Sequence, residues 1–83
     1  MEVEYKTSKG TITVDVGKEA FLAYRAVQDS GQTNMWDWEA VAILAEEQAD
    51  TYLSKDAIGA IMSNYRALAQ EYDPERYARL VRA

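Results

Sequence analysis

Apolar and polar positions alternate with a period of two over residues 2–16, and the spacing then becomes helical. Val3 and Tyr5 alternate with acidic residues, and a second alternating run ends at Val16. The segment KTSKG between the two runs consists of turn-forming residues and ends in a glycine. Residues 2–16 are therefore predicted to form a β-hairpin. Its apolar face is expected to pack against another part of the protein, because a two-stranded ribbon alone is barely stable in water.

Four later segments carry apolar residues at the three- and four-residue spacing of amphipathic helices. The predicted helices cover residues 18–30, 35–50, 55–72 and 74–82. Suitable residues stand at their ends: Gly31 fits the left-handed position after the first helix, and Asn34 and Ser54 are good N-caps for the next two. Asp73 and Pro74 together suit the start of the last helix.

These elements predict an α+β fold dominated by helices, with an N-terminal β-hairpin followed by three α-helices and a short C-terminal helix. Because a chain of 83 residues rarely divides further, we expect a single domain over residues 1–83. A domain of this size builds only a modest core, and the sequence has no cysteine that could add a disulfide. Self-association into a homodimer therefore stays open.

The predicted helix 35–50 has apolar residues on two sides. The side expected to face the core consists of Met35, Trp38, Val41, Ala42, Ala45 and Ala49. Trp36 and Ile43, seven residues apart, fall on a different side among glutamates. Exposed aromatic residues ringed by charge are typical of protein interfaces. The predicted partner-binding residues are Trp36, Glu39, Ile43, Glu46, Glu47 and Asp50. The alternative is that a helix of this chain or of a second copy covers Trp36.

The composition argues against catalysis. The sequence contains no histidine and no cysteine, which removes imidazole bases, thiolate nucleophiles and the usual zinc ligands. Carboxylate pairs such as Glu46 and Asp50 are expected to form a solvated acidic face, because nothing apolar surrounds them. We therefore predict that the protein is not an enzyme and that it has no catalytic residues, no metal site and no cofactor.

The net charge narrows the class of partner. Fourteen acidic residues against nine basic ones give a formal charge of −5 at pH 7. Nucleic acids and anionic membrane surfaces attract cationic proteins, so direct binding to either is not expected. No apolar run approaches the ~20 residues of a membrane span. With no basic-then-apolar signal pattern at the N-terminus either, the expected location is the cytoplasm. The charge favours a protein partner with a basic surface.

Residues 21–47 contain a distinctive motif, in which Ser30 and Gly31 are followed after one residue by TNMWD, ending at Asp37. In this motif the chain resembles a small domain of unknown function from tailed-phage and prophage proteins. The pattern of that domain is Ser/Thr-Gly-x-Thr-Asn-Met, an aromatic or apolar residue, and Asp. The resemblance covers about a third of the chain. It implies a small phage-carried protein in the bacterial host cytoplasm. Because the family has no established activity, it supplies no catalytic residues that could be transferred to this chain.

Together these observations give one functional hypothesis and two alternatives. The hypothesis is a small, acidic, non-catalytic phage-type protein that binds and inhibits a host protein, most concretely a nuclease-type defence effector, as anti-CRISPR proteins do. The first alternative is an oligomeric binder of a signalling nucleotide, whose phosphates would meet Arg25, Arg76 or Arg79. The second is a structural or assembly component of a phage particle.

Overall fold

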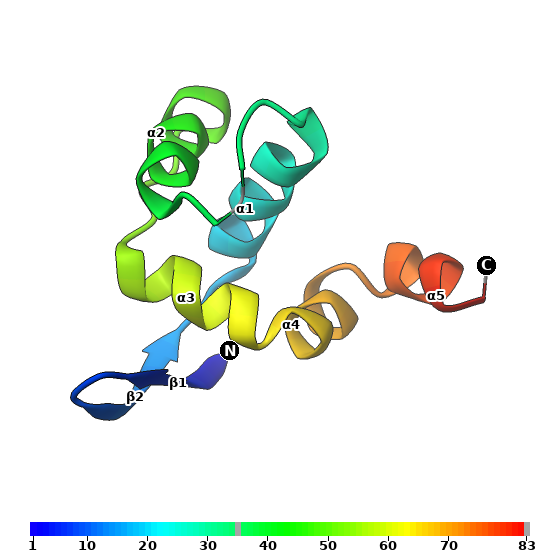
Figure 1. The fold of residues 1–83 in the computed structure, drawn as a ribbon. Helices are drawn as coiled ribbons and strands as arrows, with labels where there is room; N and C mark the ends of the chain where they lie inside the picture. Colours follow the sequence, from blue (N-terminus) through cyan, green and yellow to red (C-terminus); the bar gives the residue numbers. More distant parts are fainter. Residues whose placement is uncertain (35, 83) are drawn as a thin grey trace.

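The computed structural model of the protein describes residues 1–34 and 36–82. An N-terminal antiparallel hairpin is followed by helices, so the predicted α+β class is confirmed (Figure 1). The elements in chain order are β1 (Glu2–Thr7), β2 (Gly10–Asp15), α1 (Lys18–Ser30), α2 (Trp38–Ala49), α3 (Lys55–Ser63), α4 (Tyr65–Tyr72) and α5 (Pro74–Arg82). The expected core position of Met35 lies outside the described residues.

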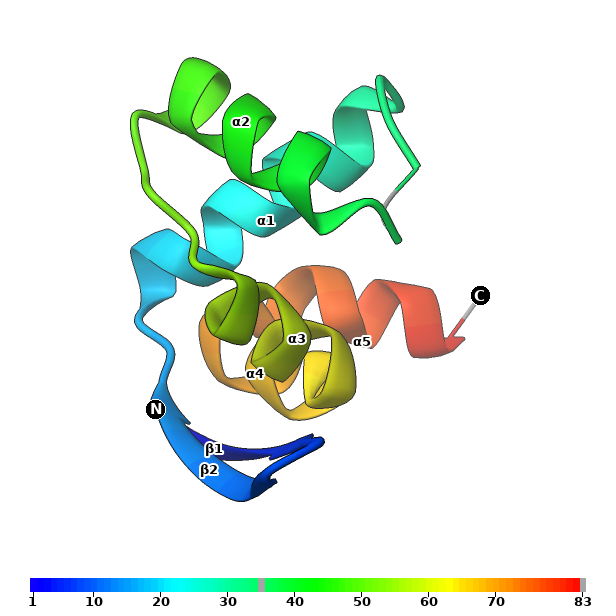
Figure 2. The same ribbon diagram turned by 60° about the vertical axis from the view of Figure 1, so that its left-hand side comes forward.

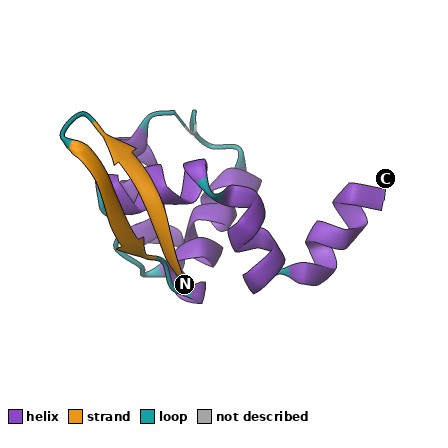
Figure 3. Cartoon of the chain, turned by 90° about the horizontal axis from the view of Figure 1, so that it is seen from below, coloured by secondary structure: helices purple, strands orange, loops and turns teal. Residues whose placement is uncertain are grey.

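The hairpin lies across the helices (Figure 3), and α3 packs against both of its strands. Val3 faces Val14 across the two strands, and Tyr5 faces Ile12. Val3 is buried against the helices, whereas Ile12, closer to the turn, stays exposed. The turn ends at Gly10, whose φ of 125° is a conformation that side chains other than glycine rarely adopt. The part of the protein against which the hairpin packs is therefore α3.

Tyr5 of β1 packs directly on α3 at Gly59. A Cβ atom at position 59 would collide with the phenol ring of Tyr5, because the ring already lies against the helix backbone. A glycine inside a helix is unfavourable by about 0.5–1 kcal/mol relative to alanine. Close packing of the hairpin on α3 accounts for its presence at this position.

We expect the effect of Gly59→Ala to change sign with the residue at position 5. In the wild-type chain the new methyl group displaces the Tyr5 ring, and overpacking of this kind costs about 1–3 kcal/mol, which exceeds the gain in helix propensity. In a Tyr5→Ala background the same substitution should raise the free energy of unfolding by about 0.5–1 kcal/mol. Urea unfolding of the four chains measures both effects. The same effect in both backgrounds would contradict the packing of Tyr5 on Gly59.

The core lies between the hairpin and helices α1 to α4, with α1 and α2 side by side (Figures 1 and 2). Helix α1 has the predicted bounds, and Gly31 follows it in the left-handed conformation with its N–H donating to the carbonyl of Gln28. The buried apolar residues are Val3, Val16, Phe21, Ala23, Tyr24, Val27, Val41, Ala45, Leu53, Ile58, Ala60, Ile61, Leu68 and Ala69. Every element from β1 to α4 contributes to this core except β2, whose Val14 packs at its edge.

The predicted helix 35–50 begins later than expected. The side chain of Asn34 accepts a hydrogen bond from the backbone N–H of Trp36 at 3.0 Å, and its carbonyl accepts one from Asp37 at 2.9 Å. These bonds form a turn, so the predicted N-cap role of Asn34 is wrong. Asp37 is the N-cap instead, with its carboxylate accepting from the N–H of Ala40 at 3.3 Å. Helix α2 consequently starts at Trp38, and Trp36 precedes it.

The predicted helix 55–72 is also wrong as a single element, because Asn64 interrupts it. Its side-chain amide donates to the carbonyl of Glu4 in the hairpin at 2.8 Å and to that of Ala60 at 3.0 Å. An asparagine that bonds the backbone in this way competes with the helical hydrogen bonds, and α3 therefore ends and α4 begins on either side of it. Ser54 caps α3 as predicted, accepting from the N–H of Ala57 at 3.1 Å.

Candidate functional site

A hollow of about 290 Å³ lies on the side of α2 that faces away from the core. Its lining consists of Trp38, Glu39, Ala42, Ile43, Glu46 and Tyr52, which we call the α2 hollow. Val41 and Ala45 of the same helix are fully buried, with α1 and α3 as the neighbouring helices. With about 3.6 residues per turn, burial of these two positions directs Ile43 and the two glutamates outward. The hollow is therefore a consequence of how α2 seats in the core.

Large apolar side chains stay exposed around this hollow. Ile43 is 58% exposed, Tyr52 is 75% exposed and Trp38 is 37% exposed. Trp38 was expected in the core, and that expectation is wrong: it stands at the first position of α2 and does not belong to the buried core. The ammonium group of Lys55 lies 5.5 Å from the centroid of its ring. Two aromatic rings and the aliphatic side chain of Ile43 are thus exposed to solvent around the hollow.

Of the predicted binding carboxylates, the structure brings two to the hollow. Glu39 and Glu46 line it, whereas Glu47 and Asp50 are exposed on the same helix and at its end without lining it. The ion pairs of the described residues all lie elsewhere, at the N-terminus and around Arg25 and Asp29. The carboxylates of the hollow are therefore available to a partner.

Trp36 is 81% exposed, which answers the question that the sequence left open. It lines a separate open groove of about 620 Å³ rather than the α2 hollow. The residues around this groove are Tyr5, Tyr24, Gln28, Trp36, Gly59, Met62, Ser63 and Tyr65. The expectation that Trp36 shares a helix face with Ile43 is wrong, because Trp36 precedes α2 and the seven-residue spacing does not apply to it.

Trp38, Ala42 and Tyr52 line the hollow although the sequence did not predict them as binding residues. Ala42, like Trp38, was expected on the core face of the helix. For Tyr52 the signal was its apolar neighbour Leu53, in the segment between α2 and α3 that belongs to neither helix. Leu53 is buried and belongs to the core, which leaves its neighbour Tyr52 directed outward. For Trp38 no such signal was present, because its exposure depends on the residue at which α2 begins.

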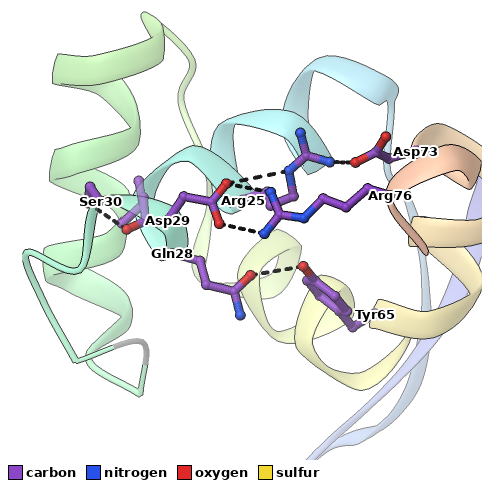
Figure 4. A network of polar contacts seen from close by, with 8 residues as sticks. Arg25, Gln28, Asp29, Ser30, Tyr65, Asp73 and Arg76 are labelled. Atoms are coloured by element: carbon purple, nitrogen blue, oxygen red, sulfur yellow. Dashed lines mark hydrogen bonds and ion pairs between the residues drawn. The ribbon is translucent and has the colours of Figure 1, made fainter. Parts of the chain in front are cut away.

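Away from the hollow, a network of ion pairs and hydrogen bonds joins α1 to α5 (Figure 4). Arg76 donates two hydrogen bonds to the carboxylate of Asp29, at 2.7 and 2.8 Å. Arg25 forms an ion pair with Asp73 and places its Nε 3.9 Å from the carboxylate of Asp29. The hydrogen bonds from Arg76 hold the pKa of the Asp29 carboxyl below its ordinary value of 3.8. Arg25 and Arg76, two of the three arginines that the nucleotide alternative offers as phosphate contacts, are therefore already paired with carboxylates.

We expect the pairing of Arg76 with Asp29 to hold α5 in place above pH 3.8. A carboxyl whose pKa is lowered by folding stabilises the fold above its ordinary pKa, and this contribution disappears as the pH falls through the lowered value. At neutral pH, Asp29→Asn should speed amide hydrogen exchange in α5 while the melting temperature changes little, because the pair is exposed.

The matched control for this pair is Asp56→Asn, which removes an exposed aspartate from the first turn of α3. Exchange in α5 should not respond to it. The difference between Asp29→Asn and the wild-type chain should also vanish once the pH is well below 3.8. A difference that persists in acid, or an α5 exchange rate unchanged by Asp29→Asn, would show that this ion pair does not hold α5.

Comparisons of the chain with protein-family models, curated proteins and solved structures gave no match. Within the described residues, no helix combines the length and apolar character needed to cross a membrane. The same part of the chain has no cluster of three or more acidic side chains placed to hold a metal ion. The chemistry of the α2 hollow is apolar contact area together with negative charge.

Proposed function

We propose that the protein is a non-catalytic binding protein that docks the α2 hollow onto a basic protein surface. One observation carries this proposal: Ile43, Tyr52 and Trp38 are exposed together around a concave surface that also contains carboxylates. Apolar patches with a polar rim are the surfaces on which proteins bind one another. Single exposed apolar residues are common, whereas a group of them around one hollow is not.

Apolar area and charge have different roles in this proposal. Complete burial of one large apolar side chain contributes about 1.5–3 kcal/mol, so Ile43 and the exposed ring of Tyr52 supply the affinity. Glu39 and Glu46 select a basic partner and speed its approach, since complementary charge raises association rates more than it raises affinity. Glu47 and Asp50 extend the negative field beyond the hollow. Trp36 offers a second exposed contact from its separate groove.

The resemblance to the tailed-phage domain makes the proposal more specific. A phage-carried protein of this kind would act in the bacterial host cytoplasm, and the partner would be a host or phage protein with a basic surface. A nuclease-type defence effector fits this description, because its nucleic-acid channel is basic. The net charge of −5 lets the protein compete for such a channel. Inhibition would then be stoichiometric.

Capture followed by an activity assay tests the proposal. The tagged protein is recovered from a bacterial lysate, the protein bound to it is identified, and the purified pair is assayed for DNA cleavage. We expect cleavage to fall in proportion to added protein and to stop at equimolar concentration. Cleavage that continues when the binding protein is saturating would contradict inhibition. Recovery of the tagged chain alone would contradict binding itself.

A further inference from the structure

We infer that the α2 hollow receives an arginine side chain of the partner, and that Lys55 occupies the place of that cation in the free protein. The inference rests on the proposed function, because it specifies what the partner presents to the same surface. It depends on three features of the hollow: a cation already bound to its indole, exposed aromatic area beside it, and carboxylates available for pairing.

The first feature is the position of Lys55 at the start of α3. Its ammonium group lies 5.5 Å from the centroid of the Trp38 ring, within the roughly 6 Å over which a ring face attracts a cation. The indole face therefore already holds a positive charge in the free protein. A lysine ammonium is strongly hydrated, whereas a guanidinium is planar, weakly hydrated and stacks on aromatic rings. An arginine is thus the better occupant of this face.

The second feature is the lining of the hollow. Tyr52 adds a second ring, three-quarters exposed, and Ile43 adds aliphatic area. The volume of about 290 Å³ lies at the lower limit of small-molecule pockets, which begin near 300 Å³. A single long side chain of a protein partner is of a suitable size for such a hollow.

The third feature is charge complementarity. Glu39 and Glu46 line the same hollow, seven residues and about two helical turns apart. The ion pairs of the described residues involve neither of them. A guanidinium pairs with a carboxylate through two parallel hydrogen bonds while its faces remain free to stack on rings. Carboxylates beside aromatic rings thus recognise arginine and repel the phosphates of a nucleic acid.

Fluorescence of Trp38 tests the inference even before a partner has been identified. Trp36→Phe leaves Trp38 as the only tryptophan of the chain, so this background reports on the hollow alone. The probes are an oligoarginine peptide, an oligolysine peptide and an oligocitrulline peptide of equal length. We expect the arginine peptide to bind most tightly, the lysine peptide several-fold more weakly, and the neutral citrulline peptide not to bind. Equal affinity for all three would overturn the inference.

Carboxylate variants locate the binding. Combining Glu39→Gln with Glu46→Gln should lower the affinity for the arginine peptide about tenfold, because hydrogen bonds to charged groups are stronger than those between neutral groups. The matched control combines Glu71→Gln with Glu75→Gln, which removes two exposed carboxylates from α4 and α5 and should have a much smaller effect. An equal loss in both double variants would mean that the peptide senses only net charge, which would overturn the inference.

Lys55 gives the sharpest test. Lys55→Ala removes a cation that competes for the Trp38 ring. We therefore expect this variant to bind the arginine peptide about two- to fivefold more tightly. Lys18→Ala removes an exposed lysine from the start of α1 and is the control for the change in net charge. Weaker binding by Lys55→Ala, or equal tightening by Lys18→Ala, would contradict the role assigned to Lys55.

The outcomes for this inference and for the proposed function are distinguishable. A captured partner that depends on Ile43 but binds the double glutamine variant normally would overturn the arginine site and leave the proposed function standing. If the arginine peptide binds as expected but the captured partner binds the Ile43→Asp variant as tightly as the wild-type chain, the arginine site stands and the proposed function is overturned. A wild-type homodimer that the arginine peptide dissociates would identify a second copy of the chain as the donor and overturn the assignment to a different protein.

Discussion

Replacing Phe21 with alanine is expected to lower the free energy of unfolding by about 3–5 kcal/mol. Phe21 of α1 is completely buried, and its ring centroid lies 5.4 Å from that of Tyr65 and 6.2 Å from that of Tyr72. The ring thereby joins α1 to α4, and its removal leaves a cavity between them. A domain of 83 residues has a total stability of roughly 4–12 kcal/mol, so this loss is a large part of the whole.

Urea unfolding at equilibrium measures the effect. Phe21→Leu retains most of the volume and should lose less, which keeps the series measurable if the alanine variant unfolds outright. Ile12→Ala, on the exposed end of the hairpin, serves as the control and should change stability by less than about 1 kcal/mol. A loss at Phe21→Ala no larger than that of the control would contradict the position of Phe21 in the core.

Replacing Ile43 with aspartate is expected to weaken partner binding by about 30-fold or more, since a central interface residue contributes about 2 kcal/mol or more. The substitution places a charge in the part of the hollow that must lose water on binding. Because Ile43 is mostly exposed in the free protein, the free energy of unfolding should change by less than about 1 kcal/mol. Affinity for the captured partner and urea unfolding give the two measurements.

Two controls separate this result from a general effect of charge or of apolar area. Ile12→Asp makes the same change at an exposed isoleucine of the hairpin and should leave binding unaltered. Trp36→Ala removes the most exposed indole, which lies in the separate groove. Binding that is lost with Trp36→Ala and kept with Ile43→Asp would move the contact to that groove and contradict the α2 hollow as the docking surface.

Elements with purely local causes could be predicted from the sequence. The hairpin follows from strict alternation around a turn, and the bounds of α1 follow from helical spacing that ends at Gly31. The beginning of α2 was misplaced because Asn34 and Asp37 are both good caps, and only the turn around Asn34 decides between them. A choice between two adequate caps depends on packing that a single sequence does not display.

Long-range contacts account for the remaining differences. The apolar stripe from Ile58 to Tyr72 continues without interruption, so it predicts one helix. The break at Asn64 arises from a hydrogen bond to Glu4, sixty residues away. The pairing of Asp29 with Arg76 likewise joins residues that share no local pattern. Contacts of this kind belong to the tertiary structure and leave no periodic signal in the sequence.

The candidate site was predictable in part, for the same reason. Helical spacing placed Ile43 and Glu46 opposite the core, and both line the hollow. The spacing failed for Trp36, because it assumed a helix that starts three residues earlier than α2 does. Exposure of Trp38 follows from that same boundary. An error of one helical turn at an N-terminus thus assigned the wrong tryptophan to the surface around Ile43: Trp38 lines the hollow, and the exposed Trp36 lines a separate groove.

Acrylamide quenching of single-tryptophan chains, with and without the captured partner, decides whether the α2 hollow is the docking surface. The Trp36→Phe chain reports on Trp38, and the Trp38→Phe chain reports on Trp36. We expect the partner to shield Trp38 from the quencher and to leave Trp36 as accessible as it is in the free protein. A partner that shields Trp36 while Trp38 remains equally quenchable would contradict docking through the α2 hollow.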